Sequence, residues 1–167
     1  MIFKFDFLRR FPAGILFSAV LCAVLAPGCA ENSLAGSLVD GYYTAEMSAF
    51  DAKGWKEFIS IYVSSGRIVS VEYNGKNASG LLKSWDPLYM QRMNGRVGTY
   101  PTEYTRAFSS SLLSRQNPDS IDAVSGATRS HAIFKLLAKT AIEQSRSGSR
   151  QVAFVAVPPE LFGHDEE

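Results

Sequence analysis

The amino-acid sequence predicts an α+β fold, in which an antiparallel sheet containing a hairpin packs against helices in one small domain. Residues 42–50 and two later segments alternate between apolar and polar side chains, as strands with one buried face do. Further along the chain, apolar residues recur at helical spacing. The composition is 46% hydrophobic and 20% charged, which is typical of a globular domain. The formal net charge of +1 gives no electrostatic case for nucleic-acid binding.

The first three predicted strands follow one another closely. The first covers residues 42–50, and one of its sides carries the apolar side chains of Tyr43, Ala45, Met47 and Ala49. Residues 58–63 and 68–73 form the second and third strands, joined by a turn at residues 64–67 into a hairpin. Strict alternation within the third strand places Ile68, Ser70 and Glu72 opposite Val69, Val71 and Tyr73.

Helices are expected in the second half of the chain. Ser84 is a candidate N-cap for a short helix that stops at Asn94-Gly95. Pro101 suits the first turn of a second helix, which Asn117-Pro118 ends. This helix has an apolar face made of Tyr104, Ala107, Phe108 and Leu112.

A third helix follows a loop of small residues at 121–130 and ends before Gly148. Its apolar positions are Ile133, Leu136, Leu137, Ala141 and Ile142. Residues 151–157 form a last strand, which Pro158-Pro159 stops.

The N-terminal segment is typical of a secretory signal. Basic residues precede a charge-free run that starts at Phe11, and small residues follow it. The apolar run has about 15 residues, whereas a membrane-spanning helix needs roughly 20. An uncleaved anchor helix is the alternative. Both cysteines, Cys22 and Cys29, lie in this region, so the rest of the chain has no disulfide and no thiolate metal site.

Residues 25–29 resemble a bacterial lipobox, in which a small residue precedes a cysteine that is diacylated and becomes the new N-terminus. Two acyl chains on Cys29 would anchor the protein stably to a membrane. The sequence thus predicts an exported lipoprotein on the extracytoplasmic face of a membrane. Its expected parts are a signal peptide at 1–28, a tether at 29–39, a domain at 40–157 and a solvated tail at 158–167.

The segment at residues 122–128 precedes the third helix and suits a phosphate group. Gly126 and Ala127 would let a large group approach the backbone, and the amides of a helix start attract anions. Arg129 adds a cation nearby. The alternative is a plain capping loop, with Ser125 or Thr128 as the N-cap.

This segment resembles the flavinylation motif of the FMN-binding domain family, an aspartate followed by a Ser-Gly-Ala-Thr core. The matching positions are Asp122, Ser125, Gly126, Ala127 and Thr128. The resemblance implies that a separate flavin transferase moves FMN from FAD onto the Thr128 hydroxyl as a phosphoester. The family includes subunits of membrane-bound ion-pumping NADH oxidoreductases and lipoproteins of extracytoplasmic electron transfer, so the resemblance implies a role in electron transfer.

The resemblance extends over residues 40–148 in the order of the family. The additional matches are Asp40-Gly41-Tyr42-Tyr43, Gly54-Trp55-Lys56, the hairpin at 59–73, the stretch 79–84 and Gln116-Asn117-Pro118. No departure affects the Ser-Gly-Ala-Thr core.

The chain itself has few groups that could activate a hydroxyl. A threonine is a weak nucleophile without a base, and His131 lies only three residues past Thr128. We expect His131 to be a solvated helix residue and Thr128 to be the acceptor in the transferase's reaction. Candidates for contact with the flavin ring, which could equally be core residues, are Trp85, Tyr89, Tyr100 and Tyr104.

These observations lead to three hypotheses about function. The first is an electron-transfer flavoprotein whose partners are the flavin transferase, the membrane and another extracytoplasmic or membrane redox protein. The second is a flavin-bearing module that donates electrons to a reductase. The third is a flavin-free lipoprotein that binds a ligand or partner. The sequence offers no nucleophile–base pair and no metal cluster, so in the first two the cofactor would carry the chemistry.

Overall fold

The structure, a computed structural model, describes residues 37–156 and 158–161. The predicted signal peptide, Cys29, most of the tether and the end of the tail lie outside these residues, so the predictions made for them stay predictions.

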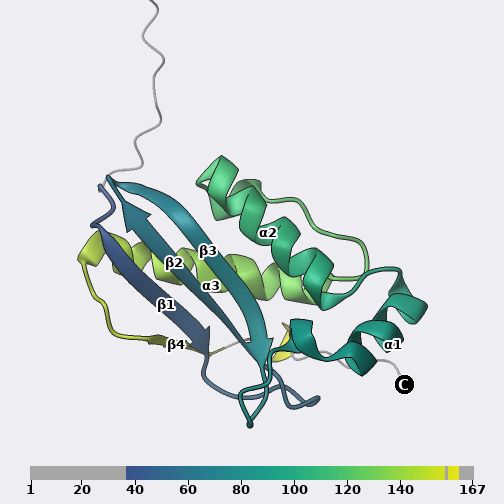
Figure 1. Cartoon of the computed structure of the whole chain (residues 1–167). Helices are drawn as coiled ribbons and strands as arrows, with labels where there is room; N and C mark the ends of the chain where they lie inside the picture. Colours follow the sequence, from purple (N-terminus) through teal and green to yellow (C-terminus); the bar gives the residue numbers. More distant parts are fainter. Residues whose placement is uncertain (1–36, 157, 162–167) are drawn as a thin grey trace, which may run out of the picture. The chain divides into compact units, whose positions relative to one another are not determined.

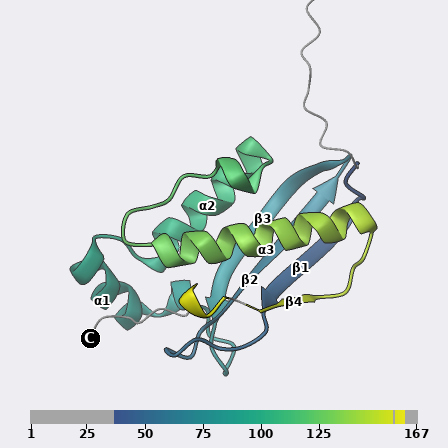
Figure 2. The same cartoon turned by 180° about the vertical axis from the view of Figure 1, so that it is seen from behind.

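A four-stranded sheet forms one layer of the domain, and two helices cover one of its faces (Figures 1 and 2). The strands are β1 (Gly41–Met47), β2 (Lys56–Ser64), β3 (Arg67–Lys76) and β4 (Ala153–Val155). They lie in the order β3-β2-β1-β4. β1, β2 and β3 are antiparallel, whereas β4 runs parallel to β1. The predicted α+β class is confirmed, and the sheet is mixed instead of purely antiparallel.

Three α-helices follow the hairpin. They are α1 (Pro87–Val97), α2 (Pro101–Arg115) and α3 (Thr128–Ser147). α3 crosses the sheet and α2 lies beside it on the same face, while α1 stands at one end of the domain (Figure 2). Short 3₁₀ turns connect them, namely η1 (Lys83–Trp85), η2 (Pro118–Ser120) and, after β4, η3 (Pro159–Leu161).

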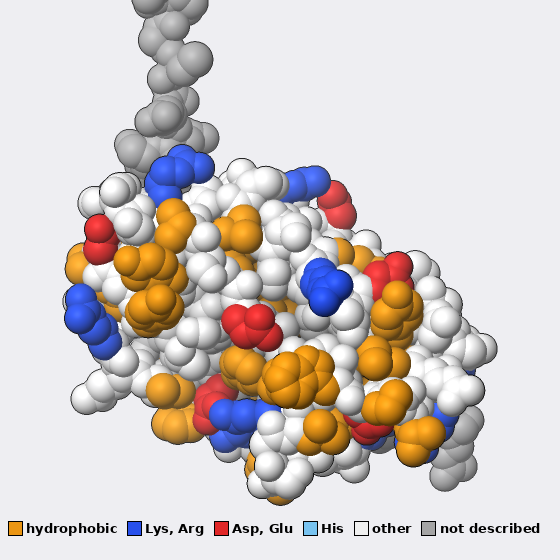
Figure 3. All heavy atoms as spheres, viewed as in Figure 1, with side chains coloured by type: hydrophobic (Ala, Val, Ile, Leu, Met, Phe, Trp, Pro, Cys, Tyr) orange, Lys and Arg blue, Asp and Glu red, His pale blue; other side chains and the backbone are white. Residues whose placement is uncertain are grey.

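The core lies between the sheet and the two helices. Its largest fully buried rings are those of Tyr43, Tyr73, Tyr104, Phe108 and Phe134. The opposite face of the sheet is open, and Figure 3 shows apolar and charged side chains intermixed on it. There the rings of Tyr42 and Tyr62 stack with centroids 4.4 Å apart.

The hairpin between β2 and β3 has the predicted position but a different phase. Ser65 and Gly66 have φ of 54° and 72°, as a tight type I′ turn requires, and Asp40 accepts hydrogen bonds from both amides. A bulge follows: Val63 pairs with Ile68, but Tyr62 pairs with Ser70. The extra residue reverses the alternation, so Ile68 and Tyr73 face the same core and the strict alternation predicted for this strand was wrong.

The start of α1 also differs from the prediction. Its N-cap is Asp86, whose side chain accepts a hydrogen bond of 2.9 Å from the amide of Tyr89. Ser84 lies instead in η1. The helix continues through Asn94-Gly95 and ends at Gly98, which has φ of 74°. The start of α1 is therefore fixed by Asp86, a hydrogen-bond acceptor, placed directly before Pro87 at the first helical position.

Residues on both sides of the predicted domain, 40–157, contact it, and two of its strands are shorter than predicted. β1 ends at Met47 and β4 at Val155, while Ala49 is exposed. Before the domain's predicted start, the Val39 amide donates a hydrogen bond of 3.0 Å to the carbonyl of Ser145. In the tail predicted to be solvated, Leu161 packs against the core. Leu38, the neighbour of Val39, also packs against the core, so both end segments contact it.

Candidate functional site

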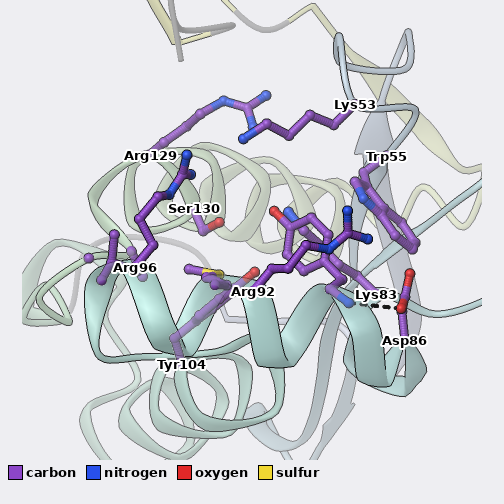
Figure 4. A pocket seen from close by; sticks show the side chains of 14 residues that line it. Lys53, Trp55, Lys83, Asp86, Arg92, Arg96, Tyr104, Arg129 and Ser130 are labelled. Carbon is purple, nitrogen blue, oxygen red and sulfur yellow. Dashed lines mark hydrogen bonds between the residues drawn. The ribbon is translucent and has the colours of Figure 1, made fainter. Parts of the chain in front are cut away.

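A pocket of about 750 Å³ opens where α1 meets the start of α3 (Figure 4). Gly126 and Ala127 of the predicted motif line it, together with Arg129 and Ser130 from the first turn of α3. The remaining lining comes from α1 and the Asp86 before it, from η1, from Tyr104 of α2 and from the loop before β2.

Basic side chains dominate the charge of this pocket. In Figure 4 the charged ends of Lys53 and Arg129 extend over one side of the opening, and Arg92 and Arg96 extend toward it from α1. A fifth cation, Lys83, lies at the pocket floor. Among the lining residues only Asp86 is acidic, so the pocket is suited to a negatively charged ligand.

Thr128 lies at the rim of this pocket. It is the first residue of α3 and is exposed, and its neighbours on both sides line the pocket. The N-cap is Ala127, which makes no side-chain capping bond, and the first turn holds no acidic residue. The capping-loop alternative, with Ser125 or Thr128 as the N-cap, was therefore wrong. The first backbone N–H groups of α3 have no acceptor within the helix and point back toward the predicted motif that precedes it.

Gly126 serves packing more than ligand access. Its φ of 76° is unfavourable for any residue with a Cβ. A Cβ at this position would lie 2.8 Å from the carbonyl oxygen of Val97 and 2.9 Å from that residue's own Cβ. Gly126 therefore allows the motif to touch the end of α1, which closes one side of the pocket.

Two of the predicted motif residues do not reach the pocket. Asp122 is largely exposed and forms an ion pair of 2.9 Å with Arg115 at the end of α2. Ser125 is exposed in the turn before Gly126. Both lie on the outer surface, where a second protein could contact them.

Arg129 connects the motif to the rest of the domain. Its guanidinium pairs with the buried carboxylate of Asp51 at 3.0 Å and also donates to the carbonyl oxygen of Leu161. The remaining nitrogen, Nη2, is buried and has no hydrogen-bond partner among the described residues. A buried guanidinium nitrogen without an acceptor is a position that an anionic ligand can satisfy.

The pocket floor holds a buried ion pair between Lys83 and Glu57. The ammonium lies 3.7 Å from the Glu57 Oε1 and 4.9 Å from the centre of the Tyr89 ring. Glu57 also accepts hydrogen bonds from the hydroxyls of Tyr73 and Ser130. Side-chain exposure is only 4% for Lys83 and 2% for Glu57, so both charges lie away from solvent.

Burial and neighbouring oxygens shift the titration of these groups in known directions. Burial acts to lower the pKa of Lys83, but Tyr104 and Glu57 act in the opposite sense, and the pKa is raised overall. Lys83 therefore stays cationic. Burial raises the pKa of Tyr104 to about 12 and that of Tyr73 well above its ordinary value, so both hydroxyls stay protonated.

Aromatic side chains form the less polar wall of the pocket. The rings of Trp55 and Tyr89 meet edge to face with centroids 5.7 Å apart. Of the four predicted ring-contact candidates, Tyr89 and Tyr104 line the pocket, whereas Trp85 and Tyr100 do not. The Trp85 side chain is 70% exposed on η1.

His131 is held by contacts of its ring with the loop before α3 and with α2. Its Nε2 lies 2.8 Å from the carbonyl oxygen of Ile121, and its ring packs against Phe108. The expectation of a solvated histidine was wrong, because this ring helps to attach the loop before α3 to the helix layer.

Apart from Arg129, sequence reasoning did not single out the basic residues of the pocket. Arg92 and Arg96 are four residues apart on α1 and resemble a solvated helix face in the sequence. Trp55 and Lys83 were available as a signal, because they fall within the Gly54-Trp55-Lys56 and 79–84 matches.

Two further properties concern the described residues. None of their helices has the length and the apolar character to cross a membrane. Within the same ranges, histidine, cysteine, aspartate and glutamate side chains do not gather in groups that could hold a metal ion.

The fold and the site define a small α+β domain with a cation-lined pocket at the start of a helix. No protein-family model matches the chain. The "15 kDa lipoprotein" of Treponema pallidum (strain Nichols) is 32% identical over 133 residues, which cover 80% of this chain and 92% of that protein. The chain belongs to the family of this lipoprotein.

Two solved structures are also similar to this chain in sequence. The CPE2226 protein from Clostridium perfringens superposes with a TM-score of 0.70 at 34% identity, covering 72% of this chain and 99% of that chain. A protein from Clostridium thermocellum, solved by solution NMR, aligns at 30% identity over 63% of this chain and 90% of its own, with a TM-score of 0.43.

Proposed function

We propose that this domain is an extracytoplasmic electron carrier that holds FMN through a phosphoester to Thr128. One observation carries the proposal: the segment that resembles a flavinylation motif begins α3 at the rim of a pocket with five cations and three aromatic rings. Either feature alone fits several ligands, but together they match a phosphate joined to an aromatic ring system.

The phosphate end of FMN fits the start of α3. Unpaired amides and the positive end of the helix dipole favour an anion there by about 0.3–1 kcal/mol, and by up to roughly 2 kcal/mol where the site is partly buried. No acidic side chain in the first turn competes for this position. The unpartnered Arg129 Nη2 would gain an acceptor.

The ring end of FMN fits the pocket itself. Trp55, Tyr89 and Tyr104 supply flat apolar surface, which favours an aromatic ligand. Arg92 and Arg96 extend toward the opening from α1. The chain's residues would thus bind and orient the flavin, and the flavin would supply the capacity to accept one or two electrons.

The position of Thr128 also supports attachment by another enzyme. Its side chain is exposed at the end of a helix, where an active site can reach it. His131 is hydrogen-bonded to the backbone of Ile121, and we expect the base that activates Thr128 to come from the transferase. Asp122 and Ser125, on the outer surface, would be contacted by that enzyme.

Membership in the lipoprotein family supports the proposed location. Lipidation of Cys29 would anchor the domain through a short tether, which would keep it in a thin layer above the membrane. In this layer its effective concentration toward membrane redox partners would be high.

The proposal is tested by producing the chain with and without a flavin transferase and measuring intact mass. We expect wild type to gain the mass of FMN less one water only with the transferase. Thr128→Val should gain nothing, while Thr140→Val, which removes a hydroxyl further along α3, should load fully. Equal flavin on Thr128→Val and wild type would overturn the proposal.

A flavin-free ligand-binding role remains the second candidate, because the basic pocket forms without any contribution from the Thr128 side chain. Two results together would favour this role. The Thr128→Val protein would bind a small anion as tightly as wild type does, and wild type would gain no flavin in the presence of the transferase.

A further inference from the structure

The burial of the ion pair between Lys83 and Glu57 is hard to explain by a gain in stability alone. Removing two charges from water costs several kcal/mol per ion, and apolar replacements of buried pairs are often as stable. Here the pair is not enclosed by the core on all sides, because Lys83 lines the pocket. The charge is thus placed next to whatever the pocket holds.

The two partners contact the pocket unequally. Glu57 is turned into the protein, where the hydroxyls of Tyr73 and Ser130 donate to it. Lys83 lies at the pocket surface, with its ammonium over the ring of Tyr89 and 3.7 Å from Glu57. The cation therefore faces the ligand space, while its counter-charge lies behind it.

From this arrangement we infer that Lys83 is the residue that sets the reduction potential of the bound flavin, and that Glu57 positions and partly offsets its charge. The inference rests on the proposed function. The oxidised flavin ring is neutral. When it takes two electrons from a redox partner and one proton from solvent, the ring carries one negative charge. A fixed cation in a poorly solvated pocket stabilises this reduced form and raises the potential.

Three variants test the inference, because they predict a pattern of signs. Lys83→Met leaves Glu57 uncompensated and should lower the midpoint potential. Glu57→Gln leaves the cation uncompensated and should raise it. The double variant removes both charges and should lie between the two single variants.

We expect Lys83→Met to change the ratio of reduced to oxidised flavin at the wild-type midpoint at least tenfold, since a charge within about 4–6 Å shifts such equilibria by one to three powers of ten. For a two-electron couple tenfold corresponds to about 30 mV. Lys139→Met removes a lysine that pairs with Asp119, ten residues past Arg129 along α3, and should leave the potential unchanged.

The measurement is a reductive titration of the flavinylated full chain with a reference dye, after intact mass has shown equal loading. Circular dichroism and thermal unfolding establish which variants are folded; if Lys83→Met is not, Glu57→Gln and the double variant still decide the sign. Equal potentials for wild type and the folded variants, or shifts of one common sign, would overturn the inference while leaving flavin attachment intact. A wild-type chain that gains no FMN mass with the transferase would overturn the proposed function and this inference with it.

Discussion

Glu46 and Glu57 both lie on strands of the same sheet and both pair with lysine, but they belong to opposite faces. Glu46 lies on the open face between Lys56 and Lys76, whose ammonium groups are 2.8 and 2.5 Å away. Phenylalanine rings cover these two lysines. Glu57 lies under the helices and has one lysine at 3.7 Å.

The two clusters differ in how their charges are used. In one, the charges are paired with each other, whereas in the other a charge faces a space that can hold a ligand. On the open face both lysines are aimed at the carboxylate of Glu46. Below the pocket, the neutral hydroxyls of Tyr73 and Ser130 donate hydrogen bonds to Glu57, and Lys83 is left facing the pocket space. Perturbed charges of the second kind are typical of functional sites.

The largest expected effect separates these two clusters by stability. Lys83→Met leaves a buried carboxylate unpaired and should lower the free energy of unfolding by about 3–5 kcal/mol. Lys76→Met leaves Lys56 in place at Glu46 and should cost about 0–1 kcal/mol. Urea unfolding of the flavin-free proteins measures both values. Similar losses of unfolding free energy in the two variants would contradict the distinction between the two clusters.

A somewhat smaller effect is expected at the glycine that closes the pocket. Gly126→Val combines an unfavourable φ with a clash against Val97 and should destabilise the domain by on the order of 3 kcal/mol. Gly95→Ala, in the middle of α1 with open space around it, should instead stabilise by about 0.5–1 kcal/mol. Thermal unfolding compares them, and a Gly126→Val protein as stable as wild type would show that α1 does not hold the motif.

These two glycines illustrate what the sequence could predict. Periodicity located β1 to β3, α2 and α3, and the Ser-Gly-Ala-Thr core located the pocket rim. The sequence could not reveal that Gly126 contacts Val97, since this contact depends on how α1 packs against the loop before α3.

The remaining differences have the same origin in tertiary structure. The bulge at Val69 reverses the phase of β3, and neither it nor the parallel addition of β4 has a local sequence signal. Likewise, Glu57 and Lys83 are 26 positions apart and become a pair only when η1 packs against β3, the neighbour of β2.

The smallest expected effect concerns alkaline pH. Unfolded tyrosine ionises near pH 10, whereas burial raises the pKa of Tyr104 to about 12. Between these values the folded state binds more protons than the unfolded state, so stability that is fully present below pH 10 is lost as the pH rises toward 12. Tyr104→Phe should make this decline less steep. Unfolding free energies measured from pH 9 to 12 decide, and an unchanged slope for Tyr104→Phe would contradict the placement of this hydroxyl.

The central claim, that the flavin is attached at Thr128, is tested most directly by peptide mass spectrometry of the chain produced with a flavin transferase. Trypsin cleaves after Arg115 and Arg129, which releases residues 116–129 with three hydroxyl side chains, those of Ser120, Ser125 and Thr128. We predict that this peptide carries the mass of FMN less one water and that fragmentation assigns it to Thr128. Assignment to either serine, or an unmodified peptide from a fully loaded preparation, would contradict the account.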